Sequence, residues 1–477
     1  MIRDQVAGKL VQLRVAGEEH QAAAPASDEA SPDARAVRPG GGNAFIETYG
    51  CQMNVSDTEL MSRVLTSQGY ALVDDPAQAD VIVVNTCAIR ENAERRVRGR
   101  VGQLQQYRVE RPELVLAVTG CMAQRVGNDL LAQNAGVDLV AGPDAYRRLG
   151  EAIEEIRQGE LPRGQTLLEL DADENYEGIS AVRREGVTAW ITVQRGCDHR
   201  CTFCIVPYVR GSEKNREAGA VLNDVRLAVA DGFTEVTLLG QTVNSYESDD
   251  WDFARLLRGV ARVPGIRRVR FTSPHPNDVN QRLIDVMSQE EAVCKQLHLP
   301  LQSGSNRVLR RMVRRYTAER FLDTVDRVRA AIPDITLSTD VIVGFPGETE
   351  ADFDETISVL QTARFDDAYL YRFSARDGTP ATRLPPADSV PDAEARRRLA
   401  TVIDVHRRIQ REINLAQVGR IVEVLVERSA RSEGDLLGRT EGNKVVAFPG
   451  RRARVGEYHK VRIVSTSGAT FRGEQVA

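Results

Sequence analysis

Hydrophobic residues come in short runs along the first third of the chain, and three of these runs end alike. Each leads through Thr or Asn into a small turn and then a cysteine. A short apolar run bounded by turn residues is typical of a buried strand. The three copies span residues 45–51, 81–87 and 115–121, and they end at Cys51, Cys87 and Cys121.

Helical patterns separate these strands. Segments 57–68 and 89–107 predict helices, and another apolar run over 137–140 predicts a fourth strand. Strands that alternate with helices at this spacing indicate a parallel sheet with right-handed crossovers. Loops that follow parallel strands lie at one edge of the sheet, where ligands bind. We therefore expect an N-terminal α/β domain over residues 43–157, with its three cysteines gathered at one edge.

The alternation resumes after a charged, irregular stretch over 157–182. Helical patterns separate further strand candidates, and about six β/α units suit a partial barrel with its site at the C-terminal strand ends. This predicts a second domain over residues 183–413. Its strand candidates are 189–193, 235–239, 267–272, 295–299, 335–343 and 367–373.

The pattern changes again after a basic helical stretch over 392–415. Short strands over 421–426, 442–448 and 460–464, with polar and Gly-rich turns, predict a small β-barrel of oligonucleotide-binding type over 414–477. This segment holds eleven Lys and Arg against seven Asp and Glu. A basic appendage on an acidic chain is compatible with a polyanionic ligand.

Composition changes this picture little. The chain has 477 residues, is 42% hydrophobic and 27% charged, and carries a net charge of −5, which is typical of globular protein. Residues 1–42 are rich in Ala, Pro, Ser and Gly and predict a disordered tail. No apolar run approaches the ~20 residues that cross a bilayer. The N-terminus also lacks the apolar segment of a secretory signal, so we expect a cytoplasmic protein with reduced thiols and no membrane partner.

A second group of three cysteines follows the first strand of the central domain. Cys197, Cys201 and Cys204 form Cys-x3-Cys-x2-Cys within eight residues. Three thiolates are one ligand short of a closed zinc or iron–sulfur site, so one loop can hold a four-iron cluster and leave one iron open. A zinc site with His199 as the fourth ligand is the alternative. Cys294, the seventh cysteine, is predicted to be buried core.

The Cys-x3-Cys-x2-Cys loop resembles the radical S-adenosylmethionine superfamily, in which an aromatic residue such as Phe203 usually precedes the third cysteine. From about residue 42 the chain resembles a methylthiotransferase, which has an N-terminal three-cysteine domain, a radical core and an RNA-binding β-barrel named TRAM. Thr242 stands where the tRNA-modifying branch more often has Asn. Segments that resemble this branch are 48–54, 239–246, 299–305 and 340–348.

The resemblance implies two four-iron clusters. Cys197, Cys201 and Cys204 would hold the cluster that generates a radical from S-adenosylmethionine. The N-terminal cysteines would hold a second cluster that donates sulfur. The implied reaction adds a methylthio group to N(6)-(dimethylallyl)adenosine beside the tRNA anticodon, and uses two S-adenosylmethionine molecules. The implied partners are tRNA, an electron donor of flavodoxin or ferredoxin type, and a sulfur or cluster delivery system.

Other readings remain open at this point. The substrate could be threonylcarbamoyl-adenosine in tRNA or an aspartate of a ribosomal protein. A different class of function is a non-catalytic, metal-binding RNA module.

Polar residues at strand ends are candidates for contacts with S-adenosylmethionine. Gly344 could instead serve a tight turn, and Ser338 and Asp340 could cap a helix. His275 and His298 are predicted to serve packing or a backbone hydrogen bond. The candidate contacts are Phe203, Gln241, Asn244, Ser338, Asp340 and Gly344.

Arginines are candidates for RNA phosphates. A dense basic run over 307–315 contains Arg314 and Arg315, although a solvated helix face is the common alternative. The resemblance to TRAM favours RNA for a second group, which comprises Arg451, Arg452 and Arg454.

Overall fold

The structure is a computed structural model, and its described residues fall into two compact units. The first extends to Arg184 and includes Tyr208–Gly211, and the second holds the rest. Residues 1–40, which form nearly all of the predicted tail, lie outside the described part of the chain. Within that part, no helix is long and apolar enough to cross a membrane. The described residues are 41–88, 91–133, 136–184, 186–432, 434–450 and 453–476.

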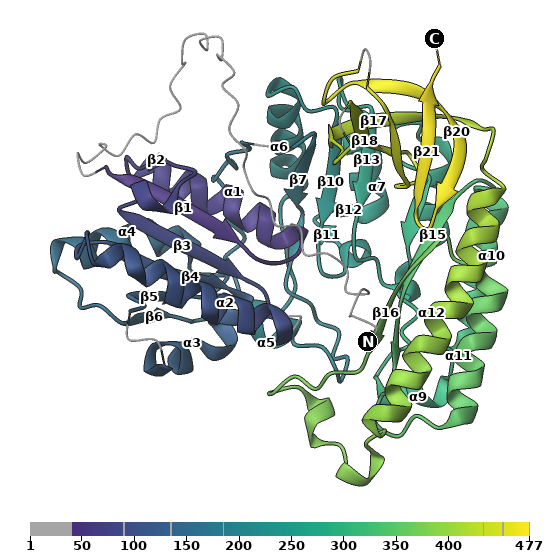
Figure 1. The fold of residues 1–477 in the computed structure, drawn as a ribbon, viewed down its shortest axis with the longest axis horizontal. Helices are drawn as coiled ribbons and strands as arrows, with labels where there is room; N and C mark the ends of the chain where they lie inside the picture. The colour runs from purple at the N-terminus through teal and green to yellow at the C-terminus, as the bar shows by residue number, and fades with distance from the viewer. Residues whose placement is uncertain are drawn as a thin grey trace. The chain divides into compact units, whose positions relative to one another are not determined.

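The first unit is a parallel sheet between two layers of helices, as predicted (Figure 1). Strand order is β2-β1-β3-β4-β5-β6, and the paired strands are all parallel. The strands are β1 (Asn43–Thr48), β2 (Ala71–Leu72), β3 (Val81–Thr86), β4 (Val115–Gly120), β5 (Leu139–Ala141) and β6 (Gln165–Leu167). The helices are α1 (Gln52–Ser67), α2 (Glu91–Leu104), α3 (Cys121–Gln133) and α4 (Tyr146–Gln158).

Alternate residues of the central strands enter different cores. Val81 and Val83 pack with residues of α1 and α4, whereas Ile82 and Val84 pack with residues of α2 and α3. Because both faces are covered, β3 and β4 are buried throughout, and this is why they appear in the sequence as continuous apolar runs.

Several details of this unit differ from the sequence-based expectation, among them the unpredicted β2 and α4. A helix, α3, follows the third cysteine as well as the first two. The stretch 157–182 is not wholly irregular, because it supplies β6 and the buried Tyr176. The Tyr176 hydroxyl donates to the Pro143 carbonyl at 2.6 Å, and its ring stacks on Tyr146.

The second unit begins with the predicted partial barrel. Its strands form two parallel sheets, β13-β10-β7 and β14-β15-β16, which a parallel bridge between Val269 and Val293 connects. The strands are β7 (Thr188–Thr192), β10 (Glu235–Leu239), β13 (Arg268–Phe271), β14 (Gln296–His298), β15 (Thr336–Val343) and β16 (Asp367–Arg372). The helices are α5 (Val206–Arg210, shared with the first unit), α6 (Ala218–Ala230), α7 (Phe253–Ala261), α8 (Gln281–Gln289), α9 (Asn306–Arg311), α10 (Ala318–Ala331), α11 (Glu350–Ala363) and α12 (Asp392–Leu415). Short pairs are β8 (Gln194–Arg195) with β9 (Lys214–Asn215), and β11 (Glu247–Ser248) with β12 (Trp251–Asp252).

A closed five-stranded barrel ends the chain, in the order β17-β18-β19-β21-β20 (yellow in Figure 1). Two of its strands were not predicted, because glycines and arginines interrupt their apolar pattern. Gly438 in β18 lies so close to β17 that a Cβ there would be 2.3 Å from the Leu425 carbonyl oxygen, which explains glycine within a strand. The strands are β17 (Ile421–Ser429), β18 (Asp435–Thr440), β19 (Val445–Pro449), β20 (Tyr458–Ser467) and β21 (Thr470–Gln475).

Two buried arginines of β13 attach this barrel to the core. Arg268 donates to the carbonyls of Glu423 and Arg439 at 2.9 and 3.0 Å. Arg270 donates to the carbonyls of Thr440 and Glu441 at 2.8 and 2.7 Å. Both guanidinium groups also lie within ion-pair distance of the buried Glu235. The barrel is therefore fixed to the core by charge-assisted hydrogen bonds to its backbone.

We expect Arg270→Met to loosen the barrel. The substitution removes the charged donor to the Thr440 and Glu441 carbonyls and the positive charge beside the buried Glu235, at a cost of about 3 kcal/mol. Hydrogen–deuterium exchange of the β17 and β18 amides should become faster. Arg267→Met is the matched control, because Arg267 is half exposed and pairs with Glu423 at the surface, so its loss should cost less than about 1 kcal/mol. Equal exchange in both variants would contradict this account of the attachment.

Candidate active site

The three N-terminal cysteines, which we name the strand-end triplet, follow three neighbouring strands. Cys51 follows β1 and caps α1, Cys87 follows β3, and Cys121 begins α3 directly after β4. Because these strands are parallel and adjacent, their ends share one edge of the sheet. The thiols of Cys51 and Cys87 are close enough to hydrogen-bond.

Two buried asparagines link the loops of the strand-end triplet. Asn54 accepts from the Cys51 amide at 3.2 Å, and its own amide nitrogen donates to the Thr86 carbonyl at 3.1 Å. Asn85 in turn donates to the Asn54 carbonyl at 2.8 Å. Neither asparagine was among the predicted site residues, although Asn85 lies within the repeated strand-turn-cysteine pattern and Asn54 lies within segment 48–54. The pair holds two of the cysteine loops together.

Charge in this site comes from Arg210, which the first unit includes through the segment Tyr208–Gly211. Its Nε donates to Cys121 Sγ at 3.1 Å, and its Nη2 pairs with Asp57 Oδ2 at 2.6 Å. The Cys87 thiol, with smaller help from Arg210 and backbone amides, lowers the pKa of Cys51 to about 6 against the effect of burial. Burial raises the pKa of Cys121. Arg210 was not among the predicted site residues.

The second set of cysteines, which we name the loop triplet (Cys197, Cys201, Cys204), lies directly after β7 and β8. Cys197 Sγ is 3.1 Å from Thr242 Oγ1, and Arg314 Nη1 donates to Cys201 Sγ at 3.4 Å. Burial raises the pKa of Cys197, and it raises the pKa of Cys204 to about 12. These thiols therefore need a strong electrophile, such as a bound metal, to become thiolates.

Backbone contacts hold the loop triplet in place. The Thr202 amide donates to the Met312 carbonyl at 3.1 Å, and the Thr202 carbonyl accepts from Ala381 at 2.8 Å. Val313 has a φ of +57°, which is strained for a β-branched residue, and it directly precedes Arg314. Arg314 thus leaves this turn with its Nη1 in contact with Cys201 Sγ.

Three predicted cofactor contacts lie around this loop. Phe203 packs against the cluster that contains Phe345. Gln241 has a buried Oε1 without a hydrogen-bond partner among the described atoms, so it has an acceptor to offer to a ligand. Asn244 instead donates to the His275 carbonyl and accepts from the His275 amide, at 2.9 and 2.7 Å. Its amide therefore positions the loop after β13.

Ser338 and Asp340 come together through a histidine that was predicted only to pack or bond the backbone. His298 Nδ1 is 3.0 Å from Ser338 Oγ, and His298 Nε2 is 3.2 Å from Asp340 Oδ2. Tyr369 meets the His298 ring edge-on. These residues occupy facing positions of β14, β15 and β16. They form a polar and aromatic cluster on one face of the sheet.

Gly344 occupies a turn that only glycine fits well. Its φ is +72°, and a Cβ would lie 2.8 Å from the Ala395 Cβ. The Gly344 amide donates to Glu348 Oε1 at 3.0 Å, and Arg398 of α12 donates to the same oxygen at 2.8 Å. Gly344 is thus required by the turn itself, whether or not a cofactor approaches it.

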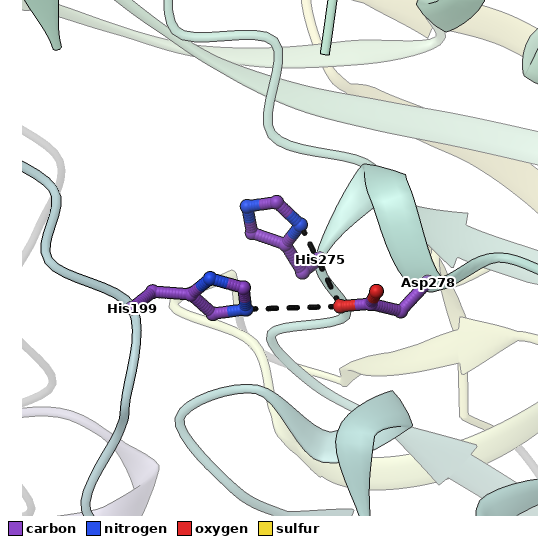
Figure 2. Close-up of side chains that lie close together, drawn as sticks. All are labelled: His199, His275 and Asp278. Carbon is purple, nitrogen blue, oxygen red and sulfur yellow. Dashed lines mark ion pairs between the residues drawn. The ribbon is translucent and has the colours of Figure 1, made fainter. Parts of the chain in front are cut away.

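A cluster of two histidines and one aspartate lies beside the loop triplet. Figure 2 shows one Asp278 oxygen facing both rings, at 3.7 Å from His199 Nε2 and from His275 Nδ1. The rings are stacked, with centroids 4.1 Å apart and planes 12° apart. A metal must lie near the plane of each ring that ligates it, and stacked rings do not share such a point. Burial, followed by Arg314, lowers the pKa of His275 to about 2, so this ring is neutral.

The predicted RNA-binding arginines divide into different environments. Arg314 faces Cys201 and the Pro300 carbonyl, so its charge is used inside the site. Arg315 and Arg454 are exposed. Arg451 and Arg452 lie outside the described residues. Within the same basic run, Arg307 pairs with the buried Asp352 and Arg311 with Asp388, so part of this run forms ion pairs within the protein.

Both triplets suit four-iron clusters. Sulfur is the usual protein ligand of such clusters, and each triplet has an arginine that donates to one of its sulfurs. All seven cysteines are free thiols. Buried polar atoms without partners, Arg210 Nη1 and Gln241 Oε1, remain for whatever binds there. The donor sets therefore fit two clusters, with one position of each left for a further ligand.

Family models match three parts of the chain. Residues 43–142 match the Uncharacterized protein family UPF0004, residues 191–360 match the Radical SAM superfamily, and residues 415–476 match the TRAM domain. These ranges correspond to the sheet, the partial barrel and the closed barrel.

Curated relatives match over most of their length. A tRNA-2-methylthio-N(6)-dimethylallyladenosine synthase from Chloroherpeton thalassium is 42% identical over 90% of this chain and 95% of its own. One of the same name from Porphyromonas gingivalis is 43% identical over 91% of this chain and 94% of its own.

Among solved structures, the fold resembles the radical S-adenosylmethionine methyltransferase TsrM from Kitasatospora setae. The TM-score is 0.54 at 15% identity, over 72% of this chain and 74% of that chain. This likeness concerns the fold alone.

The turn at Gly344 gives a direct test of its geometry. Gly378 also has a positive φ, +92°, but a Cβ there would meet no atom within 4 Å. We expect Gly378→Ala to cost about 1 kcal/mol from backbone strain. Gly344→Ala should cost at least about twice as much, because it adds the contact with Ala395. Urea unfolding of the two variants measures the difference, and equal losses would show that the contact with Ala395 is unimportant.

Proposed function

The chain belongs to the family of tRNA-2-methylthio-N(6)-dimethylallyladenosine synthases, and we propose that it converts N(6)-(dimethylallyl)adenosine beside the tRNA anticodon to its 2-methylthio derivative. The observation that carries the proposal is the similarity to these relatives over 90% of this chain and 95% of the relative, together with the family models that match the sheet, the partial barrel and the closed barrel.

The two triplets divide the chemistry. When bound, the cluster of the loop triplet generates a radical from S-adenosylmethionine, and the cluster of the strand-end triplet supplies sulfur. An aromatic C–H bond offers little to acid–base catalysis, so a radical route suits the reaction. Cys197, Cys201 and Cys204 hold the first cluster, and Cys51, Cys87 and Cys121 hold the second. Each set leaves one iron for a ligand that is not protein.

The residues of the partial barrel bind and orient the cofactor. Gln241 offers a buried, unpartnered oxygen, and Ser338 and Asp340 are held in place by His298. Phe203 and the turn at Gly344 supply apolar contacts to the cofactor, because Phe203 packs on the cluster that contains Phe345. Asn244 acts indirectly, through the loop that carries His275. Two S-adenosylmethionine molecules are used, one for the radical and one for the methyl group.

The proposal includes partners and a location. The basic closed barrel contacts tRNA phosphates through Arg451, Arg452 and Arg454, and Arg315 does so from the core. An electron donor of flavodoxin or ferredoxin type reduces the first cluster. A sulfur or cluster delivery system restores the second. These reduced clusters and thiols suit the cytoplasm.

Nucleoside analysis tests the substrate. Mass spectrometry of tRNA nucleosides should show the 2-methylthio derivative of dimethylallyladenosine in cells with this protein and its unmodified precursor in cells without it. Unchanged levels would reject the proposed substrate. A change in the threonylcarbamoyl nucleoside, or in a ribosomal-protein aspartate, would identify the alternative instead.

Cysteine variants test the division of chemistry. Protein purified without oxygen should hold about eight irons, four for each cluster. Cys201→Ala should abolish reductive cleavage of S-adenosylmethionine, because it removes a ligand of the radical cluster. Cys87→Ala should keep cleavage but stop methylthiolation of tRNA. Cys294→Ala is the matched control and should keep both activities, because Cys294 is buried and lies in neither triplet.

Two results would reject this division. Methylthiolation by the Cys87→Ala variant would remove the sulfur-donating role of the strand-end triplet. A colourless, zinc-loaded protein that fails to cleave S-adenosylmethionine would favour a non-catalytic RNA module.

A further inference from the structure

Arg210 is buried next to the strand-end triplet, and its charge is only partly used there. The side chain is 4% exposed, and its partner Asp57 is 1% exposed. Nε and Nη2 have partners, namely Cys121 Sγ and Asp57 Oδ2. Nη1 is buried and has no hydrogen-bond partner among the described atoms. An unpaired buried donor costs free energy, so this atom calls for an acceptor.

The guanidinium lies directly against a sulfur ligand of the proposed cluster. Asp57 fixes the orientation of the group by binding Nη2. Nε already donates to a cysteine sulfur, and a guanidinium directs its donors in a fixed planar fork. A cluster on Cys121 would bring inorganic sulfides close to this sulfur ligand. A fully buried cation beside such a cluster is also weakly screened.

From these contacts we propose that Arg210 is a positioning residue for the sulfur-donating cluster, with Nε holding the Cys121 thiolate and the buried guanidinium charge lying beside the bound cluster. The inference rests on the proposed cluster at the strand-end triplet. Hydrogen bonds to cluster sulfurs tune reduction potentials. Because reduction adds negative charge, a donor and a positive charge at this place stabilise the reduced state. Arg210 therefore raises the reduction potential of the second cluster.

The loop triplet offers an internal comparison. Arg314 also donates to a cysteine sulfur, but its Nη2 bonds the Pro300 carbonyl and its Nε lies 3.2 Å from the Tyr316 hydroxyl. All three nitrogens of Arg314 thus have protein partners. Arg210 differs in keeping one nitrogen for a ligand that is not protein.

The experiment measures the midpoint potential of the second cluster alone. The full chain carrying Cys197→Ala, Cys201→Ala and Cys204→Ala lacks the ligands of the first cluster, so the iron that remains reports on the second. Redox titration followed by electron paramagnetic resonance then compares this protein with versions that also carry Arg210→Lys or Arg210→Gln. We expect the midpoint potential of the second cluster to be more negative in both Arg210 variants than in the parent protein. The potential of the Gln variant should shift further, because this variant also loses the positive charge. A tenfold change in the ratio of oxidised to reduced cluster corresponds to about 59 mV.

A control separates this effect from the loss of any buried ion pair. Arg163 pairs with the buried Asp138 at 3.0 Å, next to the start of β5 rather than at the strand ends that carry the cysteines. Arg163→Gln should leave the potential unchanged. If Arg210→Gln fails to fold because the buried Asp57 loses its cation, the double variant Asp57→Asn with Arg210→Gln removes both charges and takes its place.

The outcomes are distinct. A more negative potential in the Arg210 variants, or loss of the second cluster from folded protein while Arg163→Gln retains it, supports the proposal. Potentials equal to that of the parent protein in both Arg210 variants overturn it. Absence of iron from the parent with the triple substitution would instead reject the second cluster, and with it the proposed function.

Discussion

Bringing three thiolates into one buried place is the constraint on which the rest of the structure depends. Each thiolate repels the others, and burial raises the pKa of Cys121, Cys197 and Cys204 because a charged sulfur loses its water. At both sites an arginine donates a hydrogen bond to one of the sulfurs and so offsets part of its negative charge. A cluster adds iron as the main source of positive charge. The arginines then act on the sulfurs, and they do so whether the cysteines come from one loop or from three strands.

The two triplets solve this constraint with different backbones. The loop triplet lies within eight residues, so its geometry depends on one local loop. Backbone hydrogen bonds of Thr202 to Met312 and Ala381 hold this loop in place. The strand-end triplet exists only when β1, β3 and β4 pair in register, because each strand brings one cysteine to the edge. The apolar cores on both faces of that sheet therefore maintain the site as well as the fold. Loss of core packing should disturb the strand-end triplet before the loop triplet.

The sequence was sufficient for the fold class and for placing one cysteine triplet at strand ends and the other in a single loop, because both leave local patterns. Continuous apolar runs marked β3 and β4, and cysteine spacing marked the loop triplet. The sequence did not predict β18 and β21, because glycine and arginine interrupt their apolar patterns. These segments form strands nevertheless, because they pair with their neighbours in the closed barrel. The sequence failed also for contacts between distant residues. The residues next to His298 in sequence do not indicate that its ring contacts both Ser338 and Asp340. Asn244 was predicted to contact the cofactor, and in the structure its side-chain amide hydrogen-bonds the backbone of His275.

The contacts of Arg210 are the least predictable from sequence, because its partners Asp57 and Cys121 are 153 and 89 positions away. It follows Cys204 by six residues, yet it belongs to the first compact unit. The surroundings of the strand-end triplet are thus completed by the segment that follows the loop triplet along the chain. An isolated N-terminal domain ending before that segment would keep its three cysteines and leave Asp57 buried without this partner. The charge balance of the strand-end triplet therefore requires the longer chain, even though all three of its cysteines lie within the first 121 residues.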